Sequence, residues 1–133
     1  MVVLQFDTNI LISTLLSKLA NIQIESKKMK NYSQVLSSLL KRIVEEINPL
    51  RVIWFGSVAR NTMSEESDID LLVVMPEGTH RRHTAQLIYK NIRNIGVPFD
   101  VLVVTDRDLE KHKNSVGLIY REILAEGIEV YAL

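Results

Sequence analysis

The chain has 133 residues, 47% hydrophobic and 24% charged, and its 16 basic and 16 acidic residues give a formal net charge of zero. This length suits one compact domain, and the charge balance excludes a broad, non-specific attraction to nucleic acid or to an anionic membrane. With no cysteine, no apolar run long enough to cross a bilayer and no signal-peptide pattern, we expect a cytoplasmic protein without disulfides or thiolate metal sites.

The N-terminal segment predicts a strand, a helix and a linker. Residues 2–6 are short and apolar, as in a strand, and the apolar run that follows Thr8 suits a short helix. Residues 21–31 are polar and basic, which is typical of a linker. We therefore expect an N-terminal extension at residues 1–28 and a main domain at residues 29–133.

The main domain predicts strands that alternate with helices. Four apolar runs rich in β-branched residues predict strands at 51–55, 68–75, 99–104 and 128–132. Apolar spacing, N-caps at Ser33, Thr79 and Thr105, and a stop at Gly127 predict helices at 33–47, 79–94, 105–112 and 116–126, with a short helix after Ser57. This order predicts an α/β fold, in the α+β sense, with a small mixed sheet on which helices pack.

Three aspartates lie where the predicted strands begin. Asp68 and Asp70 are two residues apart, so on a strand their side chains point to the same face with Cα atoms about 6.5 Å apart. Asp100 opens the next strand in an otherwise apolar run. If these strands are neighbours, all three carboxylates reach one point, where their hard oxygen ligands would suit one or two Mg²⁺ ions and phosphoryl transfer.

A Gly-Ser pair precedes these aspartates. Gly56 and Ser57 follow one strand and open a short helix, whose free N–H groups favour an anion. Glycine lets the backbone come close to a phosphate, the serine hydroxyl adds a donor, and Arg60 is close enough along the chain to reach the same phosphate. Each residue alone has an ordinary explanation as a cap, a loop edge or a surface charge. Their combination in this order is what favours a phosphate and metal site.

Together these residues resemble the nucleotidyltransferase superfamily that includes DNA polymerase beta, and most closely its minimal stand-alone members. The family pattern is a strand, Gly-Ser, a short helix, Asp-x-Asp on the next strand and a third carboxylate on a later one. Here it appears as FGSVAR, SDIDLLVV and FDVLVV, and the likeness runs from about Ser33 to the C-terminus. One departure is Asn61, where the family often has glycine. The resemblance implies the nucleotidyltransferase fold.

The resemblance also implies roles for the site residues. Gly56 and Ser57 would hold the nucleotide phosphates, with Arg60 at an often basic position. The three aspartates would bind Mg²⁺, as two ions, and Asp100 would also help to deprotonate the acceptor hydroxyl. The implied enzyme is a nucleotidyltransferase that transfers a nucleoside monophosphate, AMP, from an NTP such as ATP to a hydroxyl acceptor.

The resemblance further implies a protein partner. Many minimal members act beside a helical protein of the HEPN family, often a toxic ribonuclease, and serve as its antitoxin by transferring AMP to it. An alternative is a binding module that neutralises such a toxin by complex formation, with or without turnover. The complete aspartate set favours the enzyme, because a pure binder has no need of three converging carboxylates.

The first residues are similar to a different family. The stretch VVLQFDTNILISTLLSK resembles the opening of PIN-domain ribonucleases, in which the aspartate of DTN, here Asp7, binds metal. The further acidic residues of that fold are missing, so we favour a strand and helix added to the sheet. Their apolar side chains predict that they cover part of the sheet, a second copy or a partner, and the sequence leaves the oligomeric state open.

Overall fold

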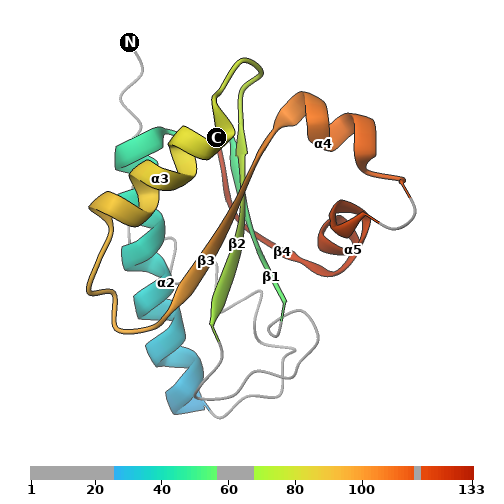
Figure 1. The fold of residues 1–133 in the computed structure, drawn as a ribbon. Helices are drawn as coiled ribbons and strands as arrows, with labels where there is room; N and C mark the ends of the chain where they lie inside the picture. The colour runs from blue at the N-terminus through green and yellow to red at the C-terminus, as the bar shows by residue number, and fades with distance from the viewer. Residues whose placement is uncertain (1–25, 57–67, 116–117) are drawn as a thin grey trace.

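The computed structural model describes residues 26–56, 68–115 and 118–133 (Figure 1). In these ranges helices alternate with strands, as the sequence predicts. The elements are α2 (Ser26–Ile47), β1 (Arg51–Phe55), β2 (Ile69–Met75), α3 (Arg81–Asn91), β3 (Phe99–Thr105), α4 (Asp106–His112), α5 (Ile119–Glu126) and β4 (Ile128–Ala132). The predicted strand and helix before residue 21, and the short helix after Ser57, lie outside the described residues.

The four described strands form one mixed sheet in the order β3-β2-β1-β4. β2 and β3 are parallel and are joined through α3, as the crossover between parallel strands requires. β1 is antiparallel to both of its neighbours, β2 and β4. The end of β1 and the starts of β2 and β3 therefore lie at the same end of the sheet (Figure 1). The predicted fold class, a small mixed sheet with helices packed on it, is confirmed.

Helices cover both faces of the sheet, α2 and α3 on one side and α4 and α5 on the other (Figure 1). Because side chains alternate along a strand, Leu71 and Val73 pack under α2 and α3, whereas Leu72 and Val74 pack under α4 and α5. This is why β2 reads as a continuous apolar run, since both of its faces are buried.

Three helix starts differ from the sequence prediction, and the last of them is α5, which begins at Ile119 with Leu118 as its N-cap. α2 begins at Ser26, so part of the segment predicted as a linker is helical. α3 begins at Arg81, and its N-cap is His80 and not Thr79. The Nδ1 atom of His80 accepts the N–H of His83, while the Thr79 hydroxyl donates to the Pro76 carbonyl in the preceding turn. The cap at Thr105 is confirmed, since its hydroxyl accepts the Asp108 N–H. No helix of the described ranges is both long and apolar enough to cross a membrane.

The buried stripe of α2 anchors this helix to the sheet. Leu36, Leu39, Leu40 and Ile43 recur at helical spacing, and all four are fully buried. The guanidinium of Arg42 donates to the carbonyls of Asn91 and Arg93, both at 3.0 Å, and so ties α2 to the end of α3. These carbonyls at a helix end otherwise lack a partner within the helix.

We expect Leu39→Ala to lower the free energy of unfolding by about 2–5 kcal/mol, because it removes buried methyl groups and leaves a cavity. Chemical denaturation followed by circular dichroism measures the change. Lys41→Ala, an exposed position two residues along the same helix, is the control and should change the stability by less than about 0.5 kcal/mol. Equal effects of the two substitutions would contradict the packing of α2 described above.

Candidate functional site

Asp70 and Asp100 lie side by side on adjacent strands. They are Cα partners in the parallel pairing of β2 with β3, so their side chains leave the same face of the sheet. That face is the one covered farther along by α4 and α5, since Leu72 follows Asp70 on it. Asp70 is half-buried and Asp100 is exposed. The predicted convergence of these two carboxylates is therefore present in the structure.

Asp68 immediately precedes β2 and is exposed to solvent. Burial raises the pKa of the Asp70 carboxyl above its usual value, and the negative charges of Asp100 and then of Asp68 raise it further. All three effects disfavour the ionised form of Asp70. The electrostatics therefore join the three predicted aspartates into one cluster of like charge.

Gly56 closes this cluster from the side of β1. It follows Phe55, which pairs with Asp70 across the antiparallel ladder, and it has a φ of +83°. A Cβ atom at this position would overlap the Oδ2 atom of Asp70. Glycine is therefore required twice, by the backbone conformation and by the close approach of the carboxylate. The backbone of Gly56 lies directly against the acidic cluster, where a bound phosphate would meet both.

The chemistry of this cluster fits a hard divalent cation. Carboxylate oxygens are the ligands that Mg²⁺ takes, and a cation would offset the like charges that act on Asp70. Within the described residues, no three His, Cys, Asp or Glu side chains are placed so that they could hold an ion. The aspartates repel one another, so a tighter arrangement requires a positive charge between them. The carboxylate oxygens thus suit Mg²⁺ as ligands. In the described residues they do not take up the geometry of a metal site without the ion.

Two predicted site residues fall outside the described residues. Ser57 and Arg60 belong to the segment 57–67, so their predicted phosphate contacts stay predictions. Of the predicted site, Gly56 and the three aspartates are described. Their assignment to phosphate and metal binding also stays a prediction, now with a geometry that suits it.

Tyr89 reaches this site although sequence analysis does not identify it. From α3 its phenolic oxygen accepts the N–H of Val101 at 2.7 Å, and its ring stacks on Phe99 with centroids 5.6 Å apart. It therefore holds the two residues that flank Asp100 on an edge strand. Nothing in the sequence signals this role, because Tyr89 lies 12 residues from Val101 and only the packing of α3 on β3 brings them together.

Comparisons with known proteins identify the family of the chain. Residues 36–130 match the family model described as "Nucleotidyltransferase domain". A protein of Methanocaldococcus jannaschii named "Putative protein adenylyltransferase MJ0604" is 30% identical over 107 residues, which cover 80% of this chain and 98% of that protein. A second protein of that organism, "Putative protein adenylyltransferase MJ0141", is 31% identical over 75 residues, which cover 56% of this chain and 70% of that protein.

One solved structure is also similar to the chain. It is the crystal structure of a "putative nucleotidyltransferase" from Sulfolobus solfataricus, with a TM-score of 0.47 and 18% sequence identity. The superposition covers 97% of this chain and 89% of that one.

We expect Asp70→Asn to stabilise the protein at neutral pH in the presence of a chelator. The raised pKa means that folded Asp70 keeps its proton to a higher pH than unfolded Asp70. Wild-type stability should therefore fall, relative to the variant, as pH rises from the unfolded value of about 3.9 through the folded pKa. Unfolding free energies measured across this window test the sign.

The control for this measurement is Glu45→Gln, at an exposed carboxylate of α2, which keeps the Asp70 carboxyl and should not stabilise the protein at neutral pH. If Asp70→Asn were instead less stable than wild type at neutral pH in chelator, the charge cluster would not carry the electrostatic cost described here.

We expect Tyr89→Phe to keep the ring stack on Phe99 but to expose the Val101 amide to solvent. Hydrogen exchange followed by NMR should show faster exchange at Val101, and stability should fall by about 0.5–1 kcal/mol. The matched control is Tyr120→Phe, at a half-buried ring that lies beside His112 and should leave Val101 unchanged. Unchanged exchange at Val101 in Tyr89→Phe would show that the hydroxyl does not hold β3.

Proposed function

Because this chain belongs to the family of nucleotidyltransferase domains, we propose that it transfers AMP from ATP to a hydroxyl group of a protein partner, in a Mg²⁺-dependent reaction. The similarity to MJ0604 covers 98% of that protein, so almost the whole relative is matched by this chain. The names of both relatives say protein adenylyltransferase, and these names support ATP as the donor and a protein as the acceptor.

The observation that carries the proposal is the register of Asp70 against Asp100, with Gly56 packed on the Asp70 carboxylate. This arrangement brings the acidic oxygens of two neighbouring strands against the backbone of a glycine. A structural role explains it poorly, because burial and then the charges of Asp100 and Asp68 raise the pKa of Asp70, so that the ionised form is disfavoured in the absence of a cation. Sites that bind metal ions and phosphates accept such a cost.

The proposed reaction forms one bond and breaks one bond at the α-phosphorus of ATP. The acceptor oxygen bonds to the α-phosphorus, the bond from that phosphorus to the oxygen bridging to the β-phosphate breaks, and pyrophosphate leaves. Asp100, an exposed carboxylate of the cluster, takes the proton of the acceptor hydroxyl. Gly56 and Ser57 hold the phosphates in line for the attack, and Arg60 contributes charge to the same group.

Mg²⁺ enters this scheme through the aspartates. Two Mg²⁺ ions would be held by Asp68, Asp70 and Asp100. When bound, these ions would neutralise phosphate charge and favour ionisation of the attacking hydroxyl. The remaining contribution of the chain is orientation, since β2 and β3 fix two of the three carboxylates on adjacent strands. Such pre-set positioning is what a phosphoryl-transfer site chiefly needs.

For the partner we propose a helical protein of the HEPN family, with this chain as its antitoxin. The support is the family resemblance of the minimal nucleotidyltransferases together with the protein acceptor named for the two relatives. Neutralisation by complex formation alone is the alternative, and it requires no transfer of AMP.

We expect Mg²⁺ with a non-hydrolysable ATP analogue to stabilise the protein by about 2.7 kcal/mol when the ligand is at 100 times its Kd. Asp68→Asn should remove the Mg²⁺-dependent part of this effect, because it removes a predicted ligand. Glu45→Gln is the matched control and should respond like wild type. A response of Asp68→Asn equal to that of wild type would refute the metal assignment.

We expect label from ATP marked at the α-phosphate to appear on the partner protein in the presence of Mg²⁺, and no label from ATP marked at the γ-phosphate. Co-expression with the protein encoded by a neighbouring gene supplies the partner, and mass spectrometry locates the added AMP. Asp70→Asn should reduce labelling at least 100-fold, since a lost charge at the reacting centre costs about 2.7 kcal/mol or more. Neutralisation without labelling would favour the binding module.

A further inference from the structure

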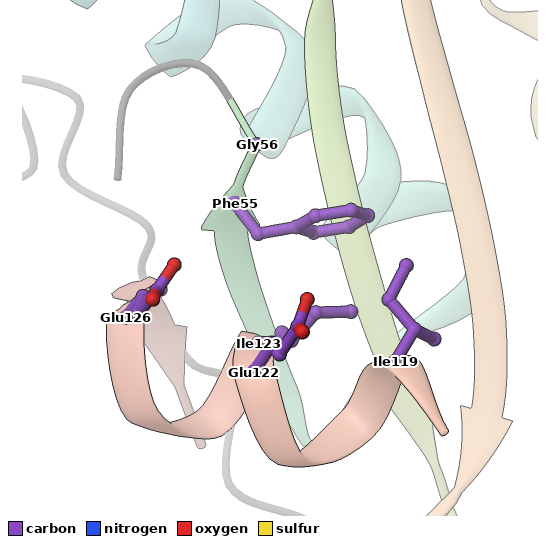
Figure 2. A pocket seen from close by; sticks show the side chains of 7 residues that line it. Phe55, Gly56, Ile119, Glu122, Ile123 and Glu126 are labelled. Atoms are coloured by element: carbon purple, nitrogen blue, oxygen red, sulfur yellow. The ribbon is translucent and has the colours of Figure 1, made fainter. Parts of the chain in front are cut away.

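A pocket between the end of β1 and α5 adjoins the acidic cluster and has no role in the scheme above. We name it the α5 pocket. It has a volume of about 90 Å³ and is lined by Phe55, Gly56, Ile119, Glu122, Ile123, Glu126 and Gly127. Its lining residues on α5 recur at i, i+3, i+4 and i+7, so they share one face of the helix. Figure 2 shows the carboxyl groups of Glu122 and Glu126 directed from α5 toward the side of Phe55 and Gly56.

Gly56 connects this pocket to the candidate site. The same residue lines the α5 pocket and lies against the carboxylate of Asp70. A ligand whose phosphate lies at Asp70 and Gly56 therefore has its next chemical group at the mouth of the pocket. The pocket is thus an extension of the phosphate site.

Charge decides which part of a nucleotide enters the α5 pocket. Its polar side chains are two carboxylates, and no lysine or arginine of the described residues lines it. A β- or γ-phosphate would be repelled there, so the departing pyrophosphate is not expected to enter the α5 pocket. The group that enters must be uncharged, must carry hydrogen-bond donors and must present an apolar side to Phe55 and Ile119. A ribose with its two hydroxyl groups, followed by a base, has these properties, and carboxylates are common partners of ribose hydroxyls.

Glu126 is placed against the preference of its own helix. It is the last residue of α5, where the helix dipole favours a cation and disfavours an acidic residue. It is also exposed, so packing does not require its side chain. A carboxylate that weakens its helix and lines a pocket beside a phosphate site is better explained by a ligand than by stability.

We propose that the α5 pocket is the ribonucleoside subsite of the transferase, a proposal that rests on the proposed nucleotidyl transfer. The carboxylate of Glu126 accepts a hydrogen bond from a ribose hydroxyl, and Phe55 and Ile119 contact the apolar side of the nucleoside. Glu126 is therefore the residue that distinguishes a ribonucleotide from a deoxyribonucleotide at this site.

The test measures binding to the full chain by calorimetry in Mg²⁺, with ATP, 2′-deoxyATP, 3′-deoxyATP and inorganic tripolyphosphate as probes. Wild type should bind ATP about tenfold more tightly than at least one of the two deoxynucleotides. Glu126→Ala should weaken ATP binding by about the same factor, abolish that preference and leave tripolyphosphate binding unchanged. Glu45→Ala, at an exposed glutamate of α2, is the control and should behave as wild type. Ile119→Ala should also weaken ATP binding without affecting tripolyphosphate.

Each other outcome overturns the proposal in a distinct way. Unchanged ATP affinity with reduced AMP transfer in Glu126→Ala would assign the pocket to the acceptor. Equal losses for ATP and tripolyphosphate would assign Glu126 to the metal or phosphate site. Unchanged ATP binding and transfer would leave the pocket without a role. Wild type that binds tripolyphosphate and both deoxynucleotides as tightly as ATP would refute the subsite alone, whereas wild type that binds none of the probes would refute the proposed function with it.

Discussion

The burial of Asp70 beside two further carboxylates at one end of the sheet is the constraint on which the site depends. Asp70 is held beside Asp100 by the parallel ladder and beside Asp68 by the chain, so it cannot move away from either. The ladder itself is held by the apolar residues that follow, because alternate side chains of β2 pack into a buried cluster on each face of the sheet. The packing of the sheet therefore maintains a concentration of negative charge that a cation would relieve.

The same end of the sheet brings backbone against this charge. Because Gly56 has no side chain, its backbone lies directly against the Asp70 carboxylate. α5 forms the next wall, and Glu122 and Glu126 line the pocket from it. On the opposite edge Tyr89 holds the backbone on both sides of Asp100. The residues around the aspartates thus come from loop and helix positions, and the two strands β2 and β3 form the rigid centre.

The sequence predicts the strands of this fold better than the starts of its helices. The strand positions were predicted well, because buried strands with β-branched residues are recognisable from composition and from the breaks around them. The sequence does not predict the start of α2 at Ser26, because the polar residues at the beginning of this helix lack apolar periodicity. The cap at His80 was missed because serine and threonine are the usual caps, whereas here an imidazole nitrogen accepts the N–H of His83.

The sequence by itself determined the family, the strands and the identity of the acidic residues, because spacing along the chain sets which side chains share a face. It indicated that Asp68 and Asp70 point together, and it identified Asp100 as the third candidate. Only the tertiary structure decided that β3 lies next to β2 in a register that pairs Asp100 with Asp70. It also decided that Gly56 contacts Asp70, that Tyr89 reaches Val101, and that α5 closes a pocket beside them. These contacts join residues distant in the chain, and such contacts arise from packing and not from local pattern.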